Sequence, residues 1–379
     1  MAVGDPNLFF SRHTKVFLKQ GVNIWEIPVL NGYSFTQATN SSTITLQEMS
    51  DVSGNSRRGQ MMFNDSLAPA EWSFDSYMRP TLVAGSPNKM FAAEEPLWAN
   101  FVAQNAYTAG STSWAYGVTR GATELDFDFD DSNKSFLGTF DLYFIYGGAL
   151  VSGLNYTASE QTTIYKMSDC VANEATINFE IDGISMISWS GMGKQIVELA
   201  SFDATGAIQT GISSTTNLVR NRLTALAAVS SVSGSSVTYD IVLTGGSITL
   251  SNNVSFLTPE TLGIVNTPLE HVAGTRSVSG NFTCYLDEKT NGSIDLYEDL
   301  IGATTAVTNA FALDFYIGGK DSGGDTPEAP GIQFKMGQCH LEIPSITNDD
   351  VIGLEVNFTA LPSNISGTNE ITRVRYVGV

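Results

Sequence analysis

The sequence contains two copies of one pattern, and this repeat constrains the fold more than any single motif does. Residues 140–148 (FDLYFIYGG) and residues 311–319 (FALDFYIGG) share Phe, Leu, Phe, Gly and Gly in register. Residues 165–170 (YKMSDC) then match residues 334–339 (FKMGQC) at almost the same separation along the chain. Two matches in the same order at nearly one separation indicate a tandem duplication.

Weaker matches indicate how far the two modules extend. They keep their order along the chain, but the separation between matched segments varies, so the halves differ in loop length. The matched pairs are 29–32 with 242–245, 74–77 with 282–285, and 189–191 with 358–360. We therefore predict one module over residues 1–205 and a second over residues 206–379, joined in the Gly- and Ser-rich stretch 204–216.

Alternating apolar and polar residues predict that the matched segments are half-buried strands, most clearly in residues 175–189 and 351–358. Residues 90–105 and 293–302 instead carry apolar residues at helical spacing, one stretch in each half. The prediction is therefore a mainly β protein with a minor α+β character, built as two tandem β-sandwich or barrel modules, each with one flanking helix. The repeat-equivalent residues predicted to form the core are Phe140, Leu142, Phe144, Cys170, Phe311, Leu313, Phe315 and Cys339.

The chain is strongly acidic. Its formal net charge is −20, although only 15% of its residues are charged. A sequence-independent grip on nucleic acid, or docking on anionic lipid, needs clustered Lys and Arg, so the composition argues against both. An acidic surface suits a protein that must avoid sticking to nucleic acid, or one that must stay soluble at high concentration. No apolar run reaches the roughly 18 residues of a membrane helix, and the first residues do not form a signal peptide, so we expect folding in a cytoplasm without membrane insertion.

The sequence offers no arrangement of residues typical of an enzyme. The three histidines lie in unrelated contexts, and no P-loop, dinucleotide fingerprint or GxSxG motif is present. We therefore predict no catalytic residues, no cofactor and no metal site. Cys170 and Cys339 occupy equivalent repeat positions on apolar strands, which favours small buried core residues over nucleophiles.

One acidic run, residues 124–131 (ELDFDFDD), has the spacing of a calcium loop at Asp126, Asp128 and Asp130. It lacks the Gly that bends such a loop and the Glu that closes it. The alternation of acidic and apolar residues favours a strand with one acidic face, and calcium binding is the alternative.

Several features together resemble the tail tube proteins of tailed bacteriophages, specifically the long forms with two copies of the tube fold. They are the common order of strands and helix in each half, the strands that end in Gly-Gly, and the segments 179–196 (FEIDGISMISWSGMGKQI) and 217–226 (NLVRNRLTAL). The likeness covers nearly the whole chain. It implies small β-sandwich or barrel modules whose subunits join edge to edge, so that their sheets line a tube. Three copies of a duplicated chain would form the pseudo-six-fold ring that six copies of a single-module member form.

The resemblance also implies a location and partners. The chain would assemble in the host cytoplasm and reside in the virion tail, bound to copies of itself and to other phage tail proteins. Viral DNA would pass through the lumen without specific binding, because an acidic wall repels phosphates over about 8 Å at physiological salt. We therefore expect carboxylates to outnumber Lys and Arg on the lumen face.

Two long segments are candidates for contacts between stacked rings. Residues 48–66 and 251–275 occupy corresponding places in the two modules and are too long for simple hairpin turns; the alternative is plain disorder. Deleting residues 52–60 is predicted to leave the fold intact and to block tube growth. The candidate contact residues are Asp51, Arg57, Arg58, Met61, Phe63, Phe256, Leu262, Ile264 and Val265.

Two other functions stay open at this point. One is another structural part of a virion, such as a baseplate or capsid decoration protein, which would not form stacked rings. The other is a carbohydrate-binding β-sandwich that uses Trp72, Trp114 and Trp189 as a sugar platform, although core packing explains these residues more simply.

Overall fold

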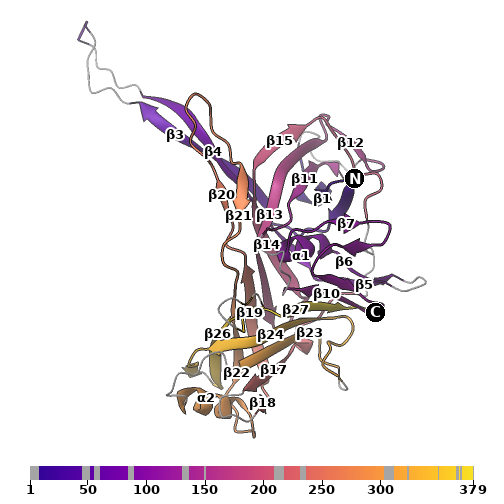
Figure 1. Cartoon of the computed structure of the whole chain (residues 1–379), viewed down its shortest axis with the longest axis vertical. Helices are drawn as coiled ribbons and strands as arrows, with labels where there is room; N and C mark the ends of the chain where they lie inside the picture. The colour runs from indigo at the N-terminus through magenta and orange to yellow at the C-terminus, as the bar shows by residue number, and fades with distance from the viewer. Residues whose placement is uncertain are drawn as a thin grey trace.

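The fold is mainly β, as predicted. The computed structural model describes residues 8–44, 52–54, 60–83, 89–129, 136–148, 151–208, 217–230, 236–302, 311–321, 324–348, 350–363, 367 and 369–378. Within these residues the α-helices are α1 (Glu95–Val102) and α2 (Ser293–Gly302) (Figure 1). The repeated Gly-Gly pairs follow matched strands, where Gly147 and Gly318 have φ values of +76° and +98° that glycine adopts without strain.

The remaining elements divide between the two halves of the chain. The first half contains η1 (Ser11–His13), β1 (Lys15–Gln20), β2 (Asn23–Ile27), β3 (Ser34–Ile44), β4 (Met61–Tyr77), β5 (Pro80–Val83), β6 (Lys89–Ala92), β7 (Tyr107–Thr108), β8 (Ser113–Trp114), β9 (Val118–Arg120), β10 (Glu124–Asp128), β11 (Phe140–Tyr146), β12 (Asn155–Thr157), β13 (Thr163–Glu180), β14 (Met186–Gly193), β15 (Gln195–Leu199) and β16 (Ser201–Asp203). The second half contains η4 (Asn221–Leu223), β17 (Ala225–Ser230), β18 (Val237–Tyr239), β19 (Leu243–Ser251), β20 (Ser255–Leu257), β21 (Glu270–Val272), β22 (Ser277–Tyr285), β23 (Phe311–Ile317), β24 (Gly331–Leu341), β25 (Ser345–Asn348), β26 (Ile352–Ala360) and β27 (Arg373–Val377).

The two halves pair their strands in the same order. In the first half β2, β1, β11, β13, β14, β4 and β3 are neighbours in turn, and β15 also pairs with β13. In the second half β18, β17, β23, β24, β26, β22 and β19 are neighbours in turn, and β27 also pairs with β24. The β11–β13 and β23–β24 ladders even share a register shift, after Phe140 and after Phe311. This common pairing supports the predicted duplication, whereas the boundary at residue 205 stays a prediction.

The halves are joined by a sheet that runs from one into the other. The later part of β13 pairs with β19 over seven residue pairs, among them Ile177 opposite Ile248. As a result β3, β4, β14, β13, β19, β22, β26 and β25 form one continuous antiparallel sheet. A second connection pairs β10 with β27, where the Arg375 guanidinium donates to both carboxylate oxygens of Asp126 at 2.6 and 2.7 Å.

Helix α1 lies at the centre of the core and contacts both halves. All eight of its residues are buried. The ring of Trp98 packs edge-on against that of Trp189 in β14 at 4.9 Å, and its Nε1 donates to the Tyr376 hydroxyl in β27 at 2.7 Å. The carbonyl of Val102, at the end of the helix, accepts a hydrogen bond of 3.0 Å from Arg276, which is only 7% exposed. The second half of the chain therefore packs directly on the helix of the first.

One predicted helix and one predicted match need correction. Helix α2 coincides with the predicted stretch 293–302, but α1 is shorter than 90–105, because β6 occupies the residues up to Ala92 and Pro96 fixes the first helical turn.

The predicted match of residues 189–191 with residues 358–360 is wrong by two residues. Ala172 lies opposite Gly191 in β14, and its counterpart Leu341 lies opposite Phe358 in β26. Gly191 therefore corresponds to Phe358, because the connection after β25 is two residues shorter than the one after β13. A shift of two residues keeps every side chain on its original face of the sheet, so the alternation in the sequence could not reveal the error.

The two halves fill this core position in opposite ways. In the first half Gly191 faces the buried indole of Trp72 across the β4–β14 ladder. In the second half Gly280 faces the buried ring of Phe358 across the β22–β26 ladder. A Cβ on Gly191 would lie 2.1 Å from the backbone oxygen of Val171 and 2.5 Å from Cζ2 of Trp72. A Cβ on Gly280 would lie 2.0 Å from the backbone oxygen of Ser247 and 2.7 Å from Cζ of Phe358. Each glycine therefore makes the space that the aromatic ring on the facing strand occupies.

Candidate functional site, a polar sheet face with open edges

The continuous sheet has one buried face and one polar face. Because side chains alternate along a strand, every second residue of each strand points away from the core. The ladders keep these residues in common rows, so that Thr176 lies between Ser188 on β14 and Thr249 on β19. Ser and Thr make up most of the row that contains Thr176, and side chains on adjacent strands are hydrogen bonded, as where Asn281 Nδ2 donates to Glu355 Oε1 at 2.8 Å.

The charged side chains on this polar face are all carboxylates, among the described residues of its eight strands. They are Glu71 and Asp75 on β4, Glu174 and Glu180 on β13, and Glu355 on β26. The repeated lysines Lys166 and Lys335 lie on other parts of the long strands and form ion pairs of 2.8 Å with Asp141 and Asp325. The polar face therefore has a negative potential, which repels other anions within about 8 Å at physiological salt.

The sheet is open at both ends. Among the described residues, β3 pairs with β4 alone and β25 pairs with β26 alone. All four residues of β25 are exposed, including Ile346 at 43%. Inside the sheet, at the corresponding place in β13, Ile177 is fully buried. Unpaired N–H and C=O groups along such an edge are a template for pairing with another chain.

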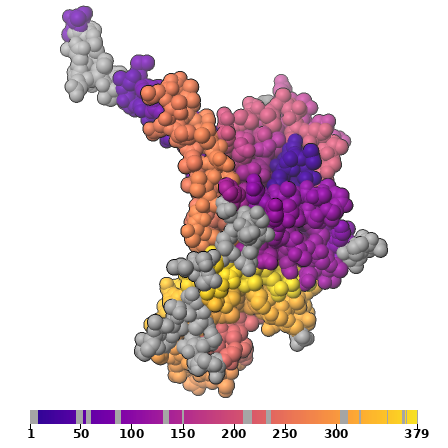
Figure 2. All heavy atoms as spheres, viewed as in Figure 1, coloured from indigo at the N-terminus to yellow at the C-terminus, as the bar shows by residue number. Residues whose placement is uncertain are grey.

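Beyond the sheet, β3 and β4 continue as a two-stranded arm that projects from the body (Figures 1 and 2). The β20–β21 hairpin lies beside its base, where the backbone N–H of Leu67 donates to the carbonyl of Asn266 at 2.8 Å. Met61 and Phe63 are on the arm and are 72% and 50% exposed. The predicted loop 48–66 is thus a strand from Met61 onward, and its apolar side chains lack a covering partner among the described residues of this chain.

The other predicted contact residues fall into three groups. Outside the described residues lie Asp51, Arg57 and Arg58. The connection between β20 and β21 contains three of them, all exposed: Leu262, Ile264 and Val265. Phe256, in β20, is half-buried instead, because it packs against a small cluster formed by Leu137, Val171 and Val254. The predicted loop 251–275 is therefore a short hairpin whose base is fixed to the first half.

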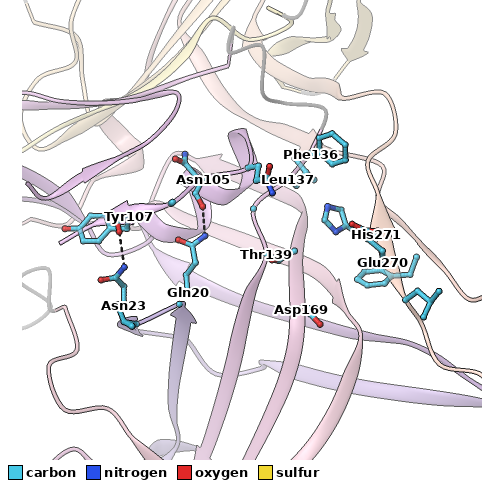
Figure 3. Close-up of a pocket in the computed structure, with 17 residues that line it drawn as sticks. Gln20, Asn23, Asn105, Tyr107, Phe136, Leu137, Thr139, Asp169, Glu270 and His271 are labelled. Atoms are coloured by element: carbon cyan, nitrogen blue, oxygen red, sulfur yellow. Dashed lines mark hydrogen bonds between the residues drawn. The ribbon is translucent and has the colours of Figure 1, made fainter. Parts of the chain in front are cut away.

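A cavity of about 750 Å³ lies between this hairpin and the first half (Figure 3). On one side Gln20 Nε2 donates to the carbonyl of Asn105 at 2.8 Å. On the other side His271 lies near Phe136, and burial lowers the pKa of the imidazole. His271 has no hydrogen-bonded nucleophile beside it in the described structure, and no group of three His, Cys, Asp or Glu able to hold a metal occurs among the described residues. The described residues that line this groove do not assemble a reactive site.

The cysteines and the acidic run have structural roles. Cys170, Cys284 and Cys339 are unpaired and buried, and burial raises the pKa of Cys284 and Cys339 to about 12, which opposes formation of a nucleophilic thiolate. The first part of the acidic run forms strand β10, with Leu125 and Phe127 buried and the Asp126 carboxylate bound to Arg375, whereas Asp130 and Asp131 lie outside the described residues.

Two further observations bear on the alternatives. The three tryptophans proposed as a sugar platform are at most 6% exposed, so Trp72, Trp114 and Trp189 form core and not a binding surface. No helix in the described part of the chain is long and apolar enough to cross a membrane.

The polar face as a whole was missed in the sequence, although its signal was present. Ser, Thr, Asn or Glu stands at every second position of 174–180, 247–251 and 277–283, without a single Lys or Arg in these segments. Such a pattern fits the outer face of any sandwich, and only the order of the strands shows that the rows are continuous across both halves.

Residues 74–360 match the sequence model of a family described as phage tail tube protein. The tail tube protein pb6 of Escherichia phage T5 is 31% identical over 373 residues, which cover 95% of this chain and 74% of that protein.

Proposed function

Because this chain belongs to the phage tail tube protein family, and is therefore a structural subunit of a tail tube, we propose that it polymerises as stacked rings of three chains. The stacked rings form the conduit through which viral DNA leaves the virion. Each chain supplies two modules, residues 1–205 and 206–379. The observation that carries the proposal is the continuous eight-stranded sheet, which is polar on one face and open at both edges.

Ring closure follows from the two open edges. β3 at one end and β25 at the other carry unpaired backbone groups, which a sister chain can satisfy by strand addition. A head-to-tail contact of this kind leaves no free edge once the rotation closes on itself. With two modules to a chain, three chains give the pseudo-six-fold ring that the resemblance implies.

The polar face of the sheet is the surface that we assign to the lumen. Its charged residues, within the described strands, are the five carboxylates Glu71, Asp75, Glu174, Glu180 and Glu355. A wall of hydroxyl and amide groups with scattered carboxylates offers phosphates no cation to bind. DNA therefore slides along this wall without being held.

Stacking of one ring on the next is assigned to the arms. The β3–β4 arm extends beyond the sheet and exposes apolar side chains, which a neighbouring ring can bury. The exposed residues of the β20–β21 connection belong to the same region of the molecule, because Asn266 in that connection is hydrogen bonded to Leu67 in β4. In this assignment the chain resides in the virion tail, assembles in the host cytoplasm, and contacts other tail proteins.

Electron microscopy of the purified chain tests the assembly. Negatively stained preparations should contain stacked rings, and averaged end-on views should have three-fold symmetry with six similar lobes. A chain that stays monomeric at high concentration, or that forms only unstacked rings, would overturn the proposal.

A charge reversal tests the lumen assignment separately. Tubes of the variant with Glu71→Lys and Asp75→Lys should retain labelled DNA fragments that wild-type tubes release. The matched control, with Glu71→Gln and Asp75→Asn, should release them like the wild type, because it adds no cation. If the lysine variant forms tubes that do not retain DNA, another face lines the lumen.

A further inference from the structure

We propose that β25 of one chain pairs with β3 of the next in a single register, in which Ile346 lies opposite Phe35. This inference rests on the proposed ring and specifies the contact that closes it. Its basis is the junction inside the chain, where β13 of the first half already pairs with β19 of the second. If the halves are equivalent, the joint between chains repeats the joint within one.

The internal junction shows what the external one must satisfy. Ile177 lies opposite Ile248 on the core side, and both side chains are fully buried. On the polar side the hydroxyls of Thr176 and Thr249 are hydrogen bonded at 3.1 Å. The next polar pair is Asn178 opposite Ser247.

β25 is the counterpart of the β13 segment in this junction. Cys170 and Cys339 mark equivalent points, because they lie opposite Phe140 and Phe311 in matching ladders. Counting on from them, Ser345 corresponds to Thr176, Ile346 to Ile177 and Thr347 to Asn178. β25 also pairs with β26 as that segment pairs with β14.

β3 is the counterpart of β19, as the ladders show when they are followed across each sheet. In the first half the residues that lie opposite one another in turn are Ala172, Gly191, Trp72 and Phe35. In the second half they are Leu341, Phe358, Gly280 and Ile248. Since Ala172 and Leu341 are equivalent, Phe35 corresponds to Ile248, and these two residues have the same separation along the chain as the matched segments 29–32 and 242–245.

Substituting these counterparts gives three contacts between chains, and each one keeps the chemistry of the internal junction. They are Ser345 with Thr36, Ile346 with Phe35, and Thr347 with Ser34. The first is again a pair of hydroxyls on the polar face, the second an apolar pair on the core face, and the third a polar pair. The register also explains why Ile346 is 43% exposed in the single chain although Ile177 is fully buried.

The external joint is shorter than the internal one. β13 runs without interruption through the junction, whereas residues 342–344, which include Pro344, separate β24 from β25. Proline has no backbone N–H to donate, and a short, interrupted edge strand discourages uncontrolled pairing of free chains. The joint therefore depends on few residue pairs, which makes their register decisive.

Pairs of cysteines test the register in assembled tubes. Phe35→Cys with Ile346→Cys, and Ser34→Cys with Thr347→Cys, represent the two kinds of position in an antiparallel ladder, which differ in Cα separation by about 1 Å. The control, Ser34→Cys with Ser345→Cys, is slipped by two residues on the same face. The native cysteines are at most 1% exposed and should not contribute.

After mild oxidation, at least one predicted pair should give covalent dimers and trimers on a non-reducing gel, at about ten times the yield of the slipped pair. The largest covalent species should be the closed ring. Tubes in which the slipped pair cross-links better, or in which no pair cross-links, would overturn the register while leaving the proposed function intact. If the wild-type chain forms no tubes by electron microscopy, the proposed function itself fails.

Discussion

The complementary glycine and aromatic residues in the two halves predict that a swap costs less stability than the sum of its two single changes. The first half places Trp72 against Gly191, and the second places Gly280 against Phe358. Trp72→Gly and Gly191→Phe, made together, would give the first half the arrangement of the second. Each change alone would leave the position empty or doubly filled.

The size of each effect follows from the packing. Trp72 is 1% exposed, and removing a buried indole of this kind costs about 3–5 kcal/mol. A side chain on Gly191 would start 2.5 Å from the indole, so Gly191→Phe alone should cost at least about 3 kcal/mol through overpacking. In the double variant the Phe ring can occupy the space that the indole leaves, but its Cβ still meets the backbone oxygen of Val171, so only the overpacking against the indole is relieved. We therefore expect the double variant to lose less stability than the sum of the two single variants, by a coupling free energy of about 2–3 kcal/mol.

Guanidinium unfolding of the four chains, followed by far-ultraviolet circular dichroism, measures this coupling without relying on tryptophan fluorescence. Ser190→Ala, on the polar face beside Gly191, is the matched control and should change stability by less than about 0.5 kcal/mol. If the double variant is as unstable as the sum of the single variants, the two positions do not share one volume and the reasoning fails.

Three further predictions concern the core and the arm. Burial raises the pKa of Glu94 to about 7, so the folded chain binds this proton more tightly than the unfolded chain. The free energy of unfolding should therefore fall by up to roughly 3 kcal/mol as the pH rises from 5 to 8. In thermal melts of Glu94→Gln over the same pH range, this fall in stability should be missing. Arg276→Met should cost about 2–4 kcal/mol in guanidinium unfolding, because the buried carbonyl of Val102 loses its donor, and Arg276→Lys should recover only part of the loss. Met61→Ser with Phe63→Ser should leave the melting temperature unchanged, since both side chains are exposed, yet shorten the tubes in micrographs; tubes of normal length would argue against a role for the arm in stacking.

The common order of strands in the two halves could be predicted because its evidence lies in contiguous strands. The segments around Phe140 and Phe311 combine alternation with turn glycines at fixed spacing, and both strands take the same place in their ladders. The weaker match of Phe74 with Phe282 is also confirmed, because these residues lie opposite equivalent positions of β14 and β26. Local patterns of this kind depend on few residues and survive differences in loop length.

The pairing between the halves could not be predicted in the same way. Nothing in the local sequence indicates that Ile177 lies opposite Ile248, because that contact depends on the path of the chain through the whole first half. The helix predicted at 90–105 was too long for a related reason. Residues 89–92 pair with β5 and form strand β6, and the local sequence does not indicate this pairing. The arm was taken for a loop because its polar and apolar residues face solvent on both sides.

The β3–β4 arm is longer than the β20–β21 hairpin in the other half, and this difference limits how neighbouring rings can be oriented. β3 and β4 have 11 and 17 residues, whereas the strands of the β20–β21 hairpin have three each. In a ring of three chains the backbone would look nearly the same after each sixth of a turn, but the long arms would coincide only after each third. Successive rings would then match at half as many rotational settings as a ring of six identical subunits allows, and at the other settings a long arm would meet the place of a short hairpin.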